Sequence, residues 1–193
     1  MINNKKYQIV YADPPWDYGN RMFSSNKNDS QRAITRAYET MKVEDITKLP
    51  IKNIINNDSV CFMWTTDAYI PCAIEIMTAW GFKYKTIAFT WIKKEKSGKQ
   101  VCYMGQWTMK GCEIVLLGTR GRMTQYLKSR KVRQLQSAIR DRKKHSQKPQ
   151  IIRDKIVEMF GDKLAKIELF AREKYEGWDV WGNEVESNIE LKI

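Results

Sequence analysis

The chain has 193 residues, 42% of them apolar, so we expect a single domain over residues 1–193. It lacks a signal-peptide pattern and the apolar run of ~20 residues that a membrane helix needs, so we expect it in the cytoplasm. Its four cysteines lack the close pairing of a zinc site and His145 is the only histidine, which predicts free thiols and implies no metal. A formal net charge of +12 favours a polyanionic partner, without distinguishing DNA from RNA.

The first predicted strand, Ile9–Ala12, ends at a turn suited to binding an amine. Pro14 and Pro15 end the strand because proline cannot donate to a β-ladder, so Asp13 lies at its carboxyl end, where open α/β sheets bind ligands. Asp13 offers a charged acceptor, the prolines are expected to leave carbonyls without a local N–H partner, and Trp16 offers a face for stacking. These groups suit the amino group of a nucleobase. The alternative is a tight turn after a core strand, with Trp16 in the core.

The next elements follow from apolar patterns and their punctuation. Residues 17–37 are polar and predict a loop over the site. The predicted elements after this loop are a helical segment at Tyr38–Leu49, a strand at Ser59–Trp64, a helix from about Ala68 to Trp80 and a strand at Lys83–Ile92. Three tryptophans in these elements are expected in the core: Trp64, Trp80 and Trp91.

The middle of the chain is basic. A loop at Lys93–Lys110 precedes a strand at Ile114–Gly118, and Arg120–Lys148 then contains a single acid, Asp141, among many Lys and Arg residues. Such a stretch is either a solvated face or a surface for phosphates. The candidate phosphate contacts are Arg120, Arg130, Lys131 and Arg133.

The last third predicts an amphipathic helix at Gln150–Gly161, a strand at Ala165–Ala171 and a closing segment at Trp178–Glu184, with a frayed tail after Val185. No Gly-x-Gly-x-x-Gly follows a strand. Glu168 and Arg172 instead end the last strand, where an acid can accept from ribose hydroxyls and a cation can order the loop. Their alternative is a surface salt bridge.

Five sequence blocks in one order resemble the adenine-N6 methyltransferase family typified by the catalytic subunit of messenger-RNA adenosine methyltransferase. The resemblance runs from about Tyr7 to about Val185 and implies a three-layer α/β, Rossmann-like sheet in circularly permuted order, with S-adenosylmethionine as the methyl donor. The blocks are Asp13-Pro14-Pro15-Trp16, Tyr38-Glu39-Thr40-Met41, Phe62-Met63-Trp64, His145-Ser146-Gln147-Lys148-Pro149 and Glu168-Leu169-Phe170-Ala171-Arg172.

The same resemblance implies a role for each matched residue. Asp13–Trp16 would be the catalytic turn, in which Asp13 and the Pro14 carbonyl accept from the amino group. Tyr38 would lie beside the target base, and Gly105, Trp107 and Glu113 match a further family pattern, with Trp107 as a substrate contact. Around the cofactor the resemblance places Asp13, Lys148 at the methionine carboxylate, and Glu168, Arg172, Asn183 and Glu184 at the ribose and adenine; Glu184 departs from the amide residue of some relatives.

The predicted function is therefore methylation of adenine N6 in a nucleic acid, on an extruded or single-stranded base. DNA is favoured because the chain lacks long extensions and its Lys-, Asn- and Ile-rich composition suits a bacterial or phage protein. Methylation of RNA is the alternative. Another is a catalytically silent nucleic-acid-binding subunit, which would be expected to have lost Asp13 or Trp16. A homodimer or a partner subunit remains open.

Overall fold

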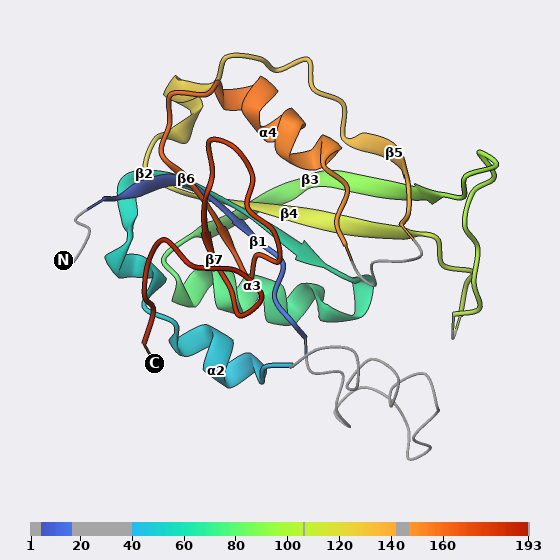
Figure 1. Cartoon of the computed structure of the whole chain (residues 1–193), viewed down its shortest axis with the longest axis horizontal. Coiled ribbons are helices and arrows are strands. Elements are labelled where there is room, and N and C mark those ends of the chain that lie inside the picture. The colour runs from blue at the N-terminus through green and yellow to red at the C-terminus, as the bar shows by residue number, and fades with distance from the viewer. Residues whose placement is uncertain (1–4, 17–39, 106, 142–146, 193) are drawn as a thin grey trace.

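A computed structural model describes residues 5–16, 40–105, 107–141 and 147–192, in which seven strands form one mixed sheet (Figure 1). Across the sheet the strand order is β5-β3-β4-β2-β1-β6-β7, which confirms the predicted Rossmann-like α/β fold. The strands are β1 (Tyr7–Ala12), β2 (Ile55–Thr65), β3 (Lys83–Lys94), β4 (Cys112–Arg120), β5 (Leu135–Ile139), β6 (Lys166–Leu169) and β7 (Asp179–Trp181).

The helices cover both faces of the sheet. α2 (Val43–Lys48) and α3 (Ile70–Ala79) lie on one face and α4 (Ile151–Phe160) lies on the other (Figure 1). Short 3-10 turns precede or follow them at Ile51–Asn53, Asp67–Tyr69 and Met123–Tyr126. The three layers match the expected architecture.

Strand direction determines which residues meet at the edge of the sheet that ends β1. β1 pairs in parallel with β2 and β6, so the carboxyl ends of these three strands lie together. β4 runs antiparallel to β2, with Ile114 opposite Thr65. The beginning of β4 therefore lies at the same edge as the end of β1.

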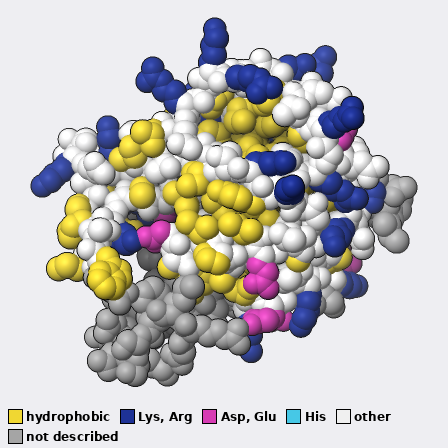
Figure 2. Space-filling model, turned by 180° about the vertical axis from the view of Figure 1, so that it is seen from behind, with side chains coloured by type: hydrophobic (Ala, Val, Ile, Leu, Met, Phe, Trp, Pro, Cys, Tyr) yellow, Lys and Arg dark blue, Asp and Glu magenta, His cyan; other side chains and the backbone are white. Residues whose placement is uncertain are grey.

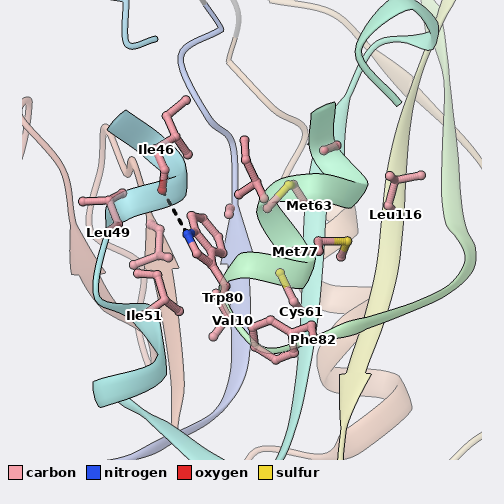
Figure 3. Packing of buried hydrophobic residues seen from close by; sticks show 14 of the residues in the cluster. Val10, Ile46, Leu49, Ile51, Cys61, Met63, Met77, Trp80, Phe82 and Leu116 are labelled. Carbon is pink, nitrogen blue, oxygen red and sulfur yellow. Dashed lines mark hydrogen bonds between the residues drawn. The ribbon is translucent and has the colours of Figure 1, made fainter. Parts of the chain in front are cut away.

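The predicted core tryptophans are confirmed. Trp64, Trp80 and Trp91 are 1%, 0% and 3% exposed. Trp80 directly follows α3, and its indole Nε1 donates a hydrogen bond of 3.0 Å to the Ile46 carbonyl of α2 (Figure 3). This bond satisfies the one polar atom of a buried side chain and holds α2 against α3.

Two segments differ from the expectation. β5 was not predicted, because its large apolar residues, Leu135 and Ile139, are 60% and 55% exposed on an edge strand and give no core pattern. The tail after Val185 is not frayed. Asn188 donates its backbone N–H to the Val180 carbonyl at 2.9 Å and accepts from the Val180 N–H at 2.8 Å, which places Leu191 against the core.

Candidate active site

A cluster of four charged side chains lies at the edge where β1 ends. Lys148 Nζ lies 3.2 Å from Asp13 Oδ1 and 3.1 Å from Glu113 Oε2, and Lys93 pairs with the other oxygen of Glu113. Glu113 reaches this edge because it is the second residue of the antiparallel β4. Lys148 also lies 5.4 Å from the centre of the Trp64 ring. When both carboxylates are ionised, two cations balance two anions.

Burial and the two lysines set the proton affinities of the cluster. Burial raises the pKa of Asp13 and outweighs the opposing effect of Lys148. Burial would also raise the pKa of Glu113, but the ammonium groups of Lys148 and Lys93 lower it to about 2. The two carboxylates raise the pKa of Lys148 despite its burial. Lys148 therefore stays charged, and Asp13 binds a proton more readily than an exposed aspartate does.

The Asp13–Trp16 turn is firmly hydrogen-bonded. The expectation that its proline carbonyls lack a local N–H partner is wrong, because the Pro14 carbonyl accepts from the Trp16 N–H at 2.9 Å and the Pro15 carbonyl accepts from the Met41 N–H at 2.9 Å. Each carbonyl keeps a second lone pair for a ligand. Trp16 is 4% exposed and its ring lies 5.4 Å from that of Tyr69, so its indole packs in the core.

A pocket of ≈ 370 Å³ opens beside Asp13, within the size range of small-molecule sites. Phe170 and Trp181 form its aromatic wall, with ring centroids 5.3 Å apart and a T-shaped arrangement. Phe170 has a φ of 61°, a left-handed conformation that costs energy in a residue other than glycine and marks functional sites. The remaining lining residues are Pro15, Met41, Leu49, Arg172, Gly182, Asn183, Glu184 and Leu191.

The polar end of the pocket comes from the two segments that follow β6 and β7. Arg172 Nε lies 3.4 Å from Glu184 Oε1, so the predicted cofactor residues Arg172, Asn183 and Glu184 line one pocket together with Asp13. A Cβ at Gly182 would lie 2.1 Å from the Ala171 carbonyl oxygen. Only glycine allows these two segments to approach so closely.

Glu168 does not line this pocket. Its carboxylate accepts from Arg153 Nε at 2.7 Å and Nη2 at 2.5 Å, on the face that α4 covers. Arg153 is 4% exposed, its guanidinium lies 3.8 Å from the Tyr175 ring centre, and its Nη1 has no partner among the described residues. Because this pair is buried, it is not the surface salt bridge of the alternative. The contact of Glu168 with a ribose stays a prediction.

Of the predicted phosphate and base contacts, Arg120 lies far from the cluster. Arg120 pairs with Ser59 in the sheet, six residues before the end of β2 at Thr65, or about 20 Å along the strand. The exposed Arg130, Lys131 and Arg133 precede β5. Trp107 is 90% exposed between β3 and β4, and Tyr38 lies outside the described residues.

Sequence reasoning did not assign a role to two groups of this site. Glu113 was noted only as part of a family pattern, and Lys93 only as the start of a basic loop. Lys93 directly follows one predicted strand and Glu113 directly precedes the next. Opposite charges at these two neighbouring strand ends are a signal for an ion pair. Arg153 gave no signal, because an arginine in an amphipathic helix is normally solvated.

No set of three or more His, Cys, Asp or Glu side chains in the described ranges is placed to hold a metal ion. The four cysteines, Cys61, Cys72, Cys102 and Cys112, are free thiols. No helix in the described part of the chain is long and apolar enough to cross a membrane.

Comparison with known proteins adds a family and relatives. The MT-A70 family model matches residues 7–184. The Type II methyltransferase M.MunI of Mycoplasma sp. is 38% identical over 97% of this chain and 82% of its own length. The N(6)-adenosine-methyltransferase subunit METTL3 of Danio rerio is 24% identical over 94% of this chain, which spans 28% of that protein. The N6-methyladenosine RNA methyltransferase MTA1 of Pyricularia oryzae is 24% identical over 93% of this chain and 47% of its own length.

Proposed function

This chain belongs to the MT-A70 methyltransferase family, and from that premise we propose that it transfers a methyl group from S-adenosylmethionine to N6 of adenine in DNA. The observation that carries the proposal is the position of Asp13. This residue is both part of the charged cluster and part of the pocket wall. A donor in the pocket and an amine at the cluster would therefore meet at one carboxylate.

The residues of the pocket fit S-adenosylmethionine. Phe170 and Trp181 offer apolar surface for an adenine ring, and Asn183 and Glu184 offer polar atoms for ribose hydroxyls. Lys148, which pairs with the pocket residue Asp13, would attract a carboxylate. When bound, S-adenosylmethionine supplies an electrophilic methyl group on a sulfonium sulfur. The family implies its use, and the pocket provides a chemically matched site.

The catalytic work of the chain lies in orienting a weak nucleophile. The lone pair of an adenine amino group is delocalised into the ring, so acceptors aimed at its N–H groups favour the more tetrahedral geometry that can attack. Asp13 and the second lone pair of the Pro14 carbonyl would be these acceptors. The raised pKa of Asp13 also makes it a better acceptor for the proton that the amine loses.

Glu113 and Lys93 keep Asp13 and Lys148 in place. Lys148 is shared between Asp13 and Glu113, and Lys93 balances the second carboxylate. Because the side chains of the cluster are only 10–20% exposed, these charges hold one another more strongly than they would in water. The site is thereby organised before substrate arrives, and proximity supplies much of the rate.

We favour DNA over RNA because this chain resembles a Type II methyltransferase over more of that relative's length than it resembles the adenosine methyltransferase METTL3. M.MunI is 38% identical over 82% of its length, whereas METTL3 of Danio rerio is 24% identical and the chain spans only 28% of it. The test measures methyl transfer from labelled S-adenosylmethionine to matched single-stranded and duplex DNA and RNA, followed by nucleoside mass spectrometry. N6-methyladenine in DNA supports the proposal, N6-methyladenosine in RNA shifts it to RNA, and binding without transfer indicates a silent subunit.

A matched pair of variants tests the role of Asp13. Asp13→Asn removes the charged acceptor with little change of shape and should lower the transfer rate by a factor on the order of 100 to 1,000. Asp162→Asn changes an exposed aspartate beside β6 and should leave the rate unchanged. Unchanged transfer by Asp13→Asn at an unchanged melting temperature would remove Asp13 from the mechanism.

We also propose that Arg130, Lys131 and Arg133 contact the phosphate backbone. All three are exposed and lie near the β5 edge of the sheet. Their joint replacement by glutamine should flatten the slope of log Kd against log salt by up to about 3. The control replaces an equal number of lysines near the opposite edge, Lys163, Lys174 and Lys192, and should leave the slope unchanged. Equal slopes for both triple variants would make the arginine segment a solvated face.

A further inference from the structure

The described residues between β3 and β4, 95–105 and 107–111, expose apolar side chains to solvent and are called the hairpin below. Six large apolar side chains are strongly exposed in the described part of the chain, and four of them lie on the hairpin. They are Tyr103, Met104, Trp107 and Met109, at 44%, 86%, 90% and 58% exposure. The other six tryptophans are buried or half-buried. Exposed apolar surface of this kind marks an interaction site.

The hairpin holds Trp107 on a defined turn. Tyr103 and Lys110 exchange two backbone hydrogen bonds, each 2.9 Å long, at the base of the tip. Within the tip, a Cβ at Gly105 would lie 2.3 Å from the Thr108 carbonyl oxygen, so the turn is closed more tightly than any residue with a side chain allows. Trp107 thus lies between two residues, Tyr103 and Lys110, that these hydrogen bonds join.

The hairpin projects past the end of the sheet on the side of the charged cluster (Figure 1). Its base is tied to that edge by the ion pair between Lys110 and Asp67, and Glu113 of the cluster follows Lys110 by three residues. Glu113 follows Trp107 by six positions, so their Cα atoms lie at most about 20 Å apart. A single duplex can therefore contact Trp107 while one of its nucleotides reaches Asp13.

The charge around Trp107 matches a polyanion. Residues 94–110 carry Lys94, Lys96, Lys99 and Lys110 and one acid, Glu95, which pairs with Arg140. In the space-filling view, hydrophobic side chains gather at the left end of the visible face, where the hairpin projects, with Lys and Arg side chains beside them (Figure 2). A second copy of this chain would bring the same positive charge to the contact, which disfavours self-association through the hairpin.

We propose that Trp107, supported by Met104, is a wedge that enters the base stack of duplex DNA when the target adenine is extruded toward Asp13. This inference rests on the proposed function. Extrusion leaves a gap in the stack, and apolar side chains that fill such a gap offset part of the cost of unstacking. The exposed indole supplies the stacking surface, and the flanking lysines hold the phosphates beside it.

The test compares the same variant on two forms of one substrate. DNA free of N6-methyladenine is offered in native and heat-denatured form, and kcat/KM for methyl transfer is measured for both. Trp107→Ala should lose roughly 10- to 100-fold on duplex DNA, the range that stacking of one base on an aromatic ring supplies, and little on single strands. Trp107→Phe should recover part of the loss. Leu135→Ala, an exposed apolar change on β5, is the matched control.

A second readout is independent of turnover. A duplex with 2-aminopurine at the mapped target adenine becomes fluorescent when that base leaves the stack, so wild type and Leu135→Ala should raise the signal and Trp107→Ala should not.

Two results would overturn the wedge and leave the proposed function standing. The first is that Trp107→Ala and wild type methylate duplex DNA at equal rates. The second is that Trp107→Ala loses equally on duplex and single strands and also changes its oligomeric mass, which would make the hairpin a protein contact. If wild type methylates neither form, the wedge falls together with the proposed function.

Discussion

Glu113→Gln tests whether the buried charges stabilise the fold as the structure indicates. The variant keeps the shape of the side chain and removes the negative charge that faces Lys148 and Lys93. The pKa of Glu113 is lowered from 4.5 to about 2 in the folded chain. At about 1.4 kcal/mol per pKa unit, the ionised carboxylate contributes about 3 kcal/mol to the free energy of unfolding at neutral pH, and the variant should lose this amount.

The sign of the pH dependence follows from the direction of the shift. Because the pKa of Glu113 is lower in the folded than in the unfolded chain, its contribution is complete well above pH 4.5 and is lost as the pH falls toward about 2. The stability difference between wild type and Glu113→Gln should therefore shrink from about 3 kcal/mol at neutral pH to about 1.4 kcal/mol near pH 3.

The assay is urea unfolding followed by tryptophan fluorescence and circular dichroism at several pH values. Glu158→Gln serves as the matched control, since Glu158 pairs with Lys155 at 2.6 Å on the surface of α4 with 44% of its side chain exposed. An exposed pair contributes about 0–1 kcal/mol, so this variant should stay close to wild type. A difference for Glu113→Gln that is near zero at neutral pH, or that does not shrink in acid, would refute the charge-cluster argument.

Three further predictions concern the buried pair, the pocket and the cluster. Arg153→Met should lower the free energy of unfolding, measured in urea, by about 3–5 kcal/mol, because it leaves Glu168 buried without its partner. Adding Glu168→Leu to this variant should restore part of the lost stability. Gly182→Ala should weaken S-adenosylmethionine binding in calorimetry at least tenfold, since the new Cβ meets Ala171 at 2.1 Å; unchanged affinity would separate this contact from the pocket. The single-turnover rate of methyl transfer should fall with decreasing pH, with a midpoint above the ordinary aspartate value of 3.8, because burial raises the pKa of Asp13 and its ionised form is the acceptor. A rate that stays flat below pH 3.8 would contradict this role.

The parts of the fold that sequence could predict are those with strong local patterns. The strands around Ile9–Ala12 and Ser59–Trp64 are continuous apolar runs, and both appear as buried central strands. β5 was missed because it has only Leu135 and Ile139 as large apolar residues, both exposed. An edge strand depends on backbone pairing with β3, which leaves no periodic signature in the chain.

The candidate site shows the same division. Asp13, Arg172, Asn183 and Glu184 meet at one pocket, because each follows a strand and these ends lie together at one edge. The partner of Glu168 could not be predicted, because it depends on which face of β6 that residue occupies. A four-residue strand does not fix its register by pattern alone.

The docked C-terminal tail links the end of the described chain to the pocket. Asn188 joins the tail to Val180 by two hydrogen bonds, and Leu191 lines the pocket wall. Coupling free energies are reciprocal. If detachment of the tail lowers the affinity for the ligand by some factor, bound ligand must lower the equilibrium constant for detachment by the same factor. Amide exchange at Asn188 would thus report occupancy of a site that its own side chain does not line.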